Sequence, residues 1–192
     1  MNSFGPEIDV SAAAYVDASV RLYGKLWAAE GSSFWPNVVA RGEIFEITIG
    51  AFTNLQDFVM LHVGYTTPTI VGAHCSITHH VTLHGCTIED NCLIGINATV
   101  MDGCVIGENS IVAGHTIVGE RTIVPPNSIV AGVPGKVIKT RNNYVENRVN
   151  AWLYHRNALA YAAGRHREWS NPAVMQACDA ERARLQAELD AG

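Results

Sequence analysis

Three histidines in the middle of the chain, His62, His79 and His84, are the residues whose type and spacing point most directly to chemistry. Neutral imidazoles bind divalent transition metals, and three of them on one ion leave a fourth position open for water or substrate. A metal held in this way lowers the pKa of its bound water to about 7 and so provides a hydroxide at neutral pH. The elements that carry the histidines decide whether the three can share one ion.

A six-residue repeat dominates the middle of the chain. Neither a helix, with a period of 3.6, nor a plain strand, with a period of 2, produces it. Aliphatic residues recur at steps of six, with a single step of five, at Val71, Ile77, Leu83, Ile88, Ile94, Val100, Ile106, Val112, Val118, Val124 and Val130. Small or slim residues follow four positions later, at Cys75, Val81, Thr87, Cys92, Ala98, Cys104, Ser110, Thr116, Thr122 and Ser128. This spacing predicts a parallel β-helix in which three units close one triangular coil.

The same step of six begins upstream at Val10, and the stretch from Trp27 to Glu46 is out of phase, as expected for coils with corner insertions. We therefore expect an all-β solenoid over residues 8–135, followed by an α-helical extension over residues 141–192.

Local signals mark two helices in this extension. Asn143 and Glu146 resemble a capping box at the start of the first helix, which should end at Gly164. Asn171-Pro172 is typical of a second helix start. We expect the first helix to lie along the prism and the second to reach a neighbouring subunit.

Composition disfavours several classes of partner. Charged residues make up only 16% of the chain, the net charge is −5, and lysine and arginine do not cluster, so nucleic acid and anionic membranes are not expected partners. No apolar run approaches 18 residues, and the first ten residues do not resemble a signal peptide. The five cysteines form no CxxC pair, and Cys75, Cys92 and Cys104 fall on the inward slim positions. Buried, reduced thiols and a cytoplasmic location are the expectation.

The phase of the repeat places the histidines. His62 and His84 each follow a leucine of the repeat by one residue, and they are 22 residues apart, one 18-residue coil plus a four-residue insertion at Tyr65–Pro68. They should stack about 5 Å apart, which suits two ligands of one tetrahedral metal. His79 lies five residues before His84, around a corner and up to roughly 15 Å away along extended chain. It could join the same metal only from the next subunit of a trimer.

The other histidines of the prism are His74, His80 and His115. Each comes three residues after an aliphatic residue of the six-residue repeat and is expected at an exposed corner. Zinc is the expected metal, with Fe²⁺ or Co²⁺ as alternatives that also suit imidazole ligands.

Several segments resemble the γ-class carbonic anhydrase family, which includes carnitine-operon and phenylacetate-degradation proteins. They are Asn54-Leu-Gln-Asp57, Leu61-His-Val63, the stretch Ile77–Ile88 with its H-x4-H spacing, and Met101-Asp-Gly103. The resemblance covers about residues 8–140. It implies a left-handed β-helix and a homotrimer, with zinc held by His62 and His84 of one subunit and His79 of the next.

The resemblance also implies roles for five further residues. Gln56 matches a glutamine that hydrogen-bonds the metal-bound water or bicarbonate, and Asn54 matches a polar residue beside the site. Arg41 and Asp57 match a salt bridge across the subunit interface. Glu43 replaces an aspartate of the family pattern, and we expect it to relay protons.

Three functions remain open on this basis. The first is reversible hydration of CO₂ to bicarbonate by a metal-bound hydroxide at the trimer interface. The second is a CoA-linked acyltransferase or thioesterase on the same fold, with a histidine as general base. The third is a metal-stabilised scaffold without catalysis. The family's acidic proton-shuttle loop has no counterpart, since Tyr65–Pro68 is short and uncharged.

Overall fold

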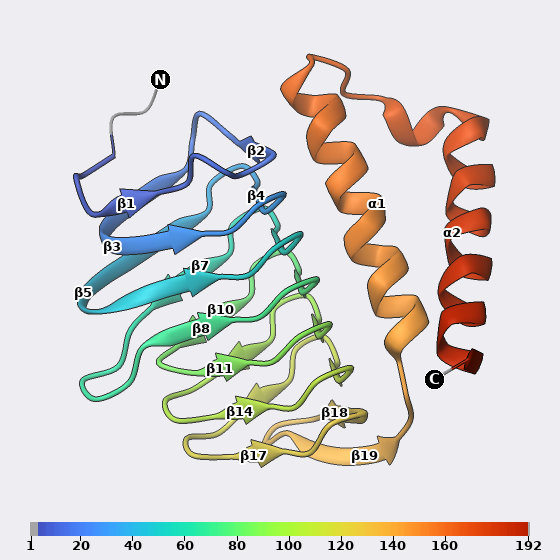
Figure 1. The fold of residues 1–192 in the computed structure, drawn as a ribbon. Coiled ribbons are helices and arrows are strands. Elements are labelled where there is room, and N and C mark those ends of the chain that lie inside the picture. The colour runs from blue at the N-terminus through green and yellow to red at the C-terminus, as the bar shows by residue number, and fades with distance from the viewer. Residues whose placement is uncertain (1–3, 192) are drawn as a thin grey trace.

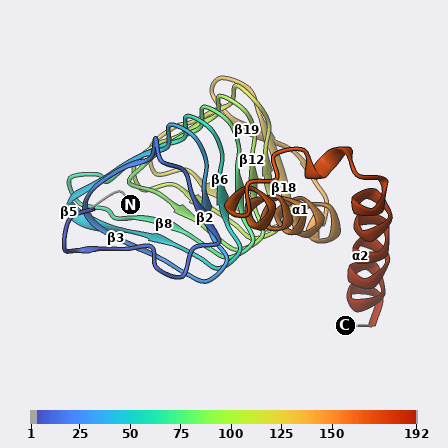
Figure 2. The ribbon, with the colours of Figure 1, turned by 90° about the horizontal axis from the view of Figure 1, so that it is seen from above.

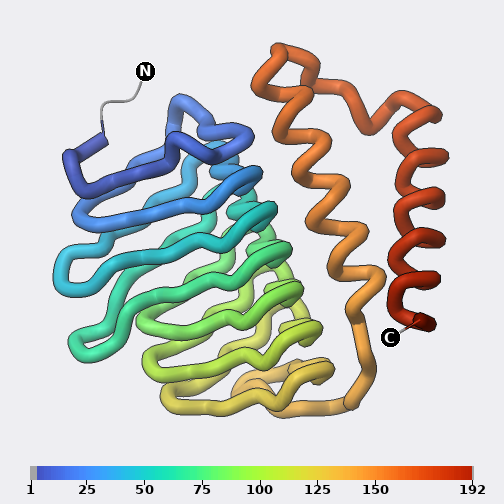
Figure 3. The backbone as a smooth tube through the Cα atoms, viewed as in Figure 1, coloured from blue at the N-terminus to red at the C-terminus, as the bar shows by residue number. Residues whose placement is uncertain are grey.

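The structure is a computed structural model that describes residues 4–191. Short strands wind into a triangular prism, and two long helices follow at the C-terminus (Figure 1). The tube through the Cα atoms shows the coils stacked one below another from the N-terminal end to the last strands (Figure 3). This is the parallel β-solenoid with a helical tail that the six-residue repeat predicts.

Two sheets cover the three faces of the prism. The 11-stranded sheet contains β1 (Ile8–Asp9), β3 (Arg21–Ala28), β5 (Val39–Ile49), β7 (Met60–His62), β8 (Thr69–Val71), β10 (Thr82–His84), β11 (Thr87–Ile88), β13 (Thr99–Val100), β14 (Val105–Ile106), β16 (Ile117–Val118) and β17 (Ile123–Val124). The eight-stranded sheet contains β2 (Tyr15–Val16), β4 (Ser33–Phe34), β6 (Asn54–Leu55), β9 (Ser76–Ile77), β12 (Leu93–Ile94), β15 (Ile111–Val112), β18 (Ser128–Ala131) and β19 (Lys136–Thr140).

The long strands β3 and β5 join two faces into one sheet. The first part of β5 pairs with β7 and its last part pairs with β8, so the strand continues around a corner of the prism. The register between β3 and β5 shifts between Gly24 and Leu26, which accommodates the extra residues at this corner. This is the stretch that falls out of phase in the sequence. At the other end, β19 pairs antiparallel with β18 and closes the stack.

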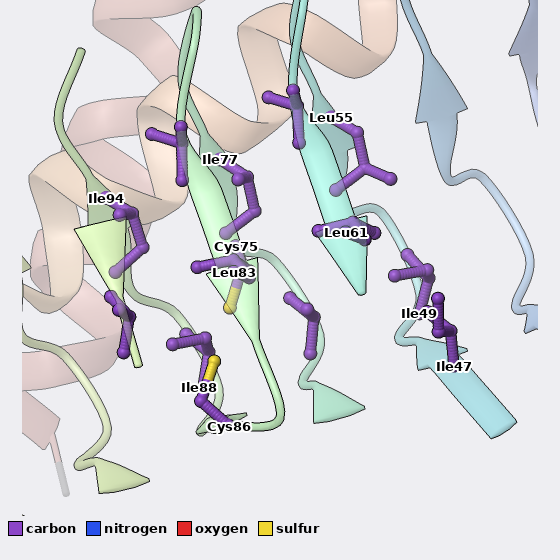
Figure 4. Packing of buried hydrophobic residues seen from close by; sticks show 14 of the residues in the cluster. Ile47, Ile49, Leu55, Leu61, Cys75, Ile77, Leu83, Cys86, Ile88 and Ile94 are labelled. Atoms are coloured by element: carbon purple, nitrogen blue, oxygen red, sulfur yellow. The ribbon is translucent and has the colours of Figure 1, made fainter. Parts of the chain in front are cut away.

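The aliphatic residues of the six-residue repeat, which we call the aliphatic ladder, fill the interior of the prism. Every ladder residue from Val71 to Val130 is at most 2% exposed. Equivalent residues of successive coils, such as Leu55, Ile77 and Ile94, pair in register and line up along the interior (Figure 4). Burial of each such side chain contributes about 1.5–3 kcal/mol.

The cysteines lie in this interior, and one slim position differs from the spacing. Cys75, Cys92 and Cys104 are buried and free, as predicted. Cys86, however, takes the inward position after Leu83, and the prediction that Thr87 would take it was wrong. This unit is one residue short, so the inward position comes one residue earlier in the chain.

Left-handed backbone residues recur at the corners of successive coils. Asparagine occupies many of these positions, because its short polar side chain tolerates positive φ. His74, His80 and His115 occupy three of them, with φ of 56°, 60° and 58°. His80 and His115 are exposed, as predicted, whereas His74 is half-buried because Arg148 and His155 of the first C-terminal helix lie beside it.

The C-terminal helices are α1 (Tyr144–Ala162) and α2 (Pro172–Ala191), with a short 3₁₀ turn, η1 (Glu168–Ser170), between them. α1 runs along the eight-stranded sheet and contacts β2, β6 and β9, as predicted. α2 packs on the side of α1 that faces away from the prism (Figure 2). Val145 and Val149 of α1 meet Cys178 and Leu185 of α2 in a small apolar cluster.

The expected capping box at the start of α1 was wrong. Asn143 precedes the helix, but its side chain makes no capping hydrogen bond. Its amide donates instead to the carbonyls of Asn109 and Arg141, because the chain leaves the prism here and its backbone acceptors need partners. Asn142 accepts a hydrogen bond from the backbone N–H of Tyr144. α2 does begin at Pro172, with Asn171 accepting from the N–H of Ala173.

None of the helices within residues 4–191 has the length and apolar character needed to cross a bilayer.

Two isoleucines of one coil test which positions of the repeat point into the prism. Ile94 is fully buried, whereas Ile96 is 47% exposed two residues later. Ile94→Ala should lower the free energy of unfolding by about 2–5 kcal/mol, since it removes buried methyl groups and leaves a cavity. Ile96→Ala should change it by less than about 0.5 kcal/mol. Chemical denaturation of both variants measures the difference, and equal costs would contradict the assigned register.

His74 predicts a pH dependence of stability. Burial under α1, aided by the Arg148 charge, lowers the pKa of His74 from 6.5 to about 4. The unfolded chain takes up this proton at higher pH than the folded one, so the stabilisation is complete above pH 6.5 and is lost as the pH falls toward 4. His74→Asn keeps a residue that tolerates positive φ and should reduce the loss of stability over this interval. His115→Asn, at an exposed corner position that also has positive φ, should not alter it; identical denaturation profiles for both variants would refute the role of His74.

Candidate metal site and the family of the chain

His62 and His84 stand one above the other at the ends of β7 and β10. The two strands are parallel and pair in a register that sets His84 opposite His62. Their ring centroids are 5.0 Å apart, and the Nδ1 atom of His62 lies 3.0 Å from the Nε2 atom of His84. The predicted stacking of the two imidazoles is therefore found.

Carboxylates hold the outer nitrogens of both rings. Glu43 Oε2 lies 2.8 Å from His62 Nε2, and the Nη1 of Arg41 donates to Glu43 Oε1 at 2.6 Å. The hydrogen bond with His62 is the main reason that the pKa of Glu43 is lowered. On the other ring, Asp102 Oδ2 lies 2.9 Å from His84 Nδ1. With Asp102 accepting from Nδ1, the Nε2 atom of His84 is the free ligand atom, and it faces His62.

Asp102 is a site residue that the sequence argument did not assign. It lies 18 residues after His84, whereas this coil is only 17 residues long because it contains the shortened unit, so Met101 is in register with His84 and Asp102 follows it at the corner. Gly64 and Gly85 make room for it, because a Cβ atom on either glycine would collide with Asp102 Oδ1. A side chain at either glycine would displace the carboxylate that orients His84.

The histidine pair opens onto a cavity of about 390 Å³ at a corner of the prism. Charged and apolar groups line it together: Arg41, Glu43, Ile44, His62, Val63, Gly64, Tyr65 and His84. Tyr65, in the insertion after β7, is 91% exposed. The corner insertions at β5 and β7 therefore build the walls of this cavity.

His79 lies at the opposite edge of the same face. It precedes β10, whereas His84 ends it, and its Nδ1 atom lies 3.0 Å from Asp57 Oδ2. Within residues 4–191, no group of three or more His, Cys, Asp or Glu side chains is close enough to hold a metal ion. A single chain thus brings His62 and His84 together and keeps His79 apart, as the spacing predicts.

Asn54 and Gln56 belong to the His79 side of the prism. Both are buried, and Gln56 Nε2 donates to Asn54 Oδ1 at 2.9 Å. Asn54 Nδ2 in turn donates to Ser76 Oγ at 3.0 Å, and Ser76 Oγ donates to Asn150 Oδ1 of α1 at 2.8 Å. Gln56 is followed in sequence by Asp57, and because Asp57 contacts His79, this hydrogen-bond network lies next to His79. Arg41 lies with the other cavity, so the predicted Arg41–Asp57 pair is not formed within one chain.

Comparison with known proteins identifies the family. Residues 85–119 match the bacterial transferase hexapeptide family (six repeats). A probable carbonic anhydrase of Methanocaldococcus jannaschii is 53% identical over 118 residues, which cover 62% of this chain and 74% of that protein. The chain belongs to the γ-class carbonic anhydrase family.

A plant relative in this family is longer, and a solved structure shares the fold. The mitochondrial γ carbonic anhydrase 3 of Arabidopsis thaliana is 39% identical over 105 residues, which cover 52% of this chain and 41% of the plant protein. The chain thus matches about two fifths of the length of that relative. A hexapeptide transferase family protein of Anaplasma phagocytophilum has a TM-score of 0.71 and 28% identity, covering 82% of this chain and 91% of the other.

Proposed function

We propose that the protein is a zinc-dependent homotrimeric enzyme that interconverts CO₂ and bicarbonate. The main observation that supports this proposal is the His62–His84 pair, two imidazoles one coil apart with ring nitrogens 3.0 Å from each other. The high identity to a relative named as a probable carbonic anhydrase supports this choice of reaction.

The donor set fits a zinc ion. Two nitrogens bound to one tetrahedral zinc lie about 3.3 Å apart, given bonds of about 2.0–2.1 Å, and the two rings need only small shifts to reach that spacing. Asp102 accepts from Nδ1 of His84, the arrangement that fixes the tautomer of a metal-binding histidine. Asp57 holds His79 in the same way. Iron or cobalt could occupy the same nitrogen set.

The trimer supplies the third ligand. His79 and Asp57 lie at one edge of a face and His62 and His84 at the other, so a neighbouring subunit can bring the two edges together. Arg41, beside His62, then comes close to Asp57 of the neighbour. This pairing would add a second partner to Arg41, which already donates to Glu43, and to Asp57, which already holds His79.

When bound, the metal supplies a nucleophile at neutral pH and polarises the substrate. The residues of the chain bind, orient and move protons around it. The buried amide of Gln56 is fixed by Asn54 and is proposed to orient bicarbonate. Glu43 sits at the open cavity with its carboxylate on His62 and Arg41, and it is proposed to pass protons to solvent.

An acyl-group reaction is the second candidate. The hexapeptide family match is named for transferases, and so is the structural relative from Anaplasma phagocytophilum. In this reading a histidine acts as general base and the cleft between subunits holds CoA. A metal-stabilised scaffold without catalysis is the third. Metal content, CO₂ hydration and acyl-CoA turnover, measured on one preparation, separate the three.

Mixing subunits tests the shared site. His79→Ala and His62→Ala chains should each lose metal and CO₂ hydration, because each lacks one ligand at every interface. After subunit exchange, some interfaces combine an intact His62 with an intact His79, and a fraction of metal content and activity should return. His80→Ala, an exposed neighbour of His79, should leave both unchanged.

Verified exchange with no recovery of metal would contradict the shared site. Recovery of metal without CO₂ hydration would keep the site and refute the proposed reaction.

Asp102→Asn tests how His84 is held. Asparagine is close in size to the carboxylate but carries no charge, so the Nδ1–H of His84 should be held less strongly. Metal affinity, measured by competition with a chelator, should fall about 10- to 100-fold. Asp90 is another corner aspartate, and its carboxylate accepts from the backbone N–H of Ala73, so Asp90→Asn should leave the affinity unchanged. An unchanged affinity in Asp102→Asn would show that this carboxylate does not support the site.

A further inference from the structure

The C-terminal segment builds a second cavity beside His79. It measures about 270 Å³, and we call it the aromatic recess because Trp35, Tyr154, Tyr161 and Trp169 line it. Trp35 comes from the prism, the two tyrosines come from α1, and Trp169 comes from η1. The recess is therefore absent from a bare prism and depends on how α1 and η1 fold back.

The rings form walls that meet at steep angles. Trp35 and Tyr154 cross at 88° with centroids 5.6 Å apart, and Tyr154 and Trp169 cross at 89° with centroids 5.2 Å apart. Tyr161 meets Trp35 at 65° and 4.8 Å. Perpendicular walls offer both ring faces and ring edges to a flat guest, the two arrangements that aromatic pairs prefer. Trp35 is buried at the base of these contacts, and Trp169 is 43% exposed.

The coil register fixes where this recess opens. Phe34, Leu55 and Ile77 pair in register, so the residues two positions later, Pro36, Asp57 and His79, occupy equivalent places in successive coils. All three line the recess. A guest in the recess would thus lie directly beside His79, the ligand proposed to reach the neighbouring subunit's metal.

The charged side chains that line the recess differ in whether they have an ion-pair partner. Asp57 is paired with His79 at 3.0 Å. Tyr154 remains a neutral phenol at physiological pH, since burial raises its pKa to about 12. Arg167 also lines the recess, and no ion pair is found for its side chain in the described part of the chain. Arg167 is therefore available to pair with an anionic group of a guest.

We propose that the aromatic recess binds a small aromatic group that carries an anionic substituent. The ring would lie in the cavity against the wall that Trp169, Tyr154 and Trp35 form, and the anionic substituent would face Arg167. The role of this recess as a subsite of the metal centre rests on the proposed function. Binding in the recess does not, because none of its walls is His62 or His84.

Calorimetric titration of the intact protein with three matched probes tests the proposal. Benzoate has the ring and the charge, cyclohexanecarboxylate has the charge without the ring, and benzyl alcohol has the ring without the charge. Benzoate should bind most tightly of the three. Equal affinity for benzoate and cyclohexanecarboxylate, or no binding of benzoate, would overturn the proposal.

Variants locate the bound probe. Trp169→Ala should weaken benzoate binding about two- to tenfold, the loss expected for one aromatic contact. Trp27→Ala is the matched control, since Trp27 is 49% exposed on β3 and lies outside the recess. Arg167→Gln should weaken benzoate while leaving benzyl alcohol unchanged. Circular dichroism of each variant checks that the helices remain folded.

His62→Ala separates this inference from the proposed function. It removes a proposed metal ligand and leaves the recess intact, so benzoate should still bind while metal content falls. Benzoate binding that disappears in His62→Ala but survives Trp169→Ala and Arg167→Gln would place the anion on the metal and overturn the recess site. If neither the unmodified protein nor any variant hydrates CO₂, the proposed reaction is refuted, whereas the conclusion about benzoate binding is unaffected.

Discussion

The pairing of each coil with the next is the constraint on which the rest of the structure depends. Parallel backbone pairing fixes both the spacing and the register of successive coils, so residues at equivalent positions lie above one another. The same register that stacks Leu55, Ile77 and Ile94 in the interior also stacks His62 on His84 at the corner. The rigid core therefore sets the geometry of the two imidazoles, and no flexible loop has to bring them together.

The corner insertions and the C-terminal helices add the features of a functional site to the regular prism. Extra residues at the corners of β5 and β7 place Glu43 against His62 and form the cavity above the histidine pair. α1 crosses the other side of the prism, where Asp57 and His79 sit, and adds aromatic walls beside them. The two halves lie at opposite edges of one face. Such a division is what a site shared between identical subunits would require, and in the proposed trimer metal binding would depend on assembly.

Membership of the γ-class carbonic anhydrase family narrows the chemistry without fixing the substrate. One hexapeptide prism carries both carbonic anhydrases and transferases among the relatives of this chain. CO₂ is a small guest for a cavity of about 390 Å³, and the chain carries a second cavity of about 270 Å³ beside His79. The aromatic recess offers a physical reason to look for a larger substrate or effector beside His79.

The solenoid, its inward residues and the stacked His62–His84 pair all follow from counting along the chain, because a period of six translates directly into position. Counting also sets Met101 in register with His84 and leaves Asp102 one residue further along, at the corner. It failed at Cys86, where a shortened unit shifts the phase by one residue, and at Asn143, whose side chain bonds backbone carbonyls instead of capping α1. The half-burial of His74 and the recess beside His79 arise where α1 and η1 pack on the prism. Contacts between segments a hundred residues apart carry no local period, so only packing in three dimensions establishes them.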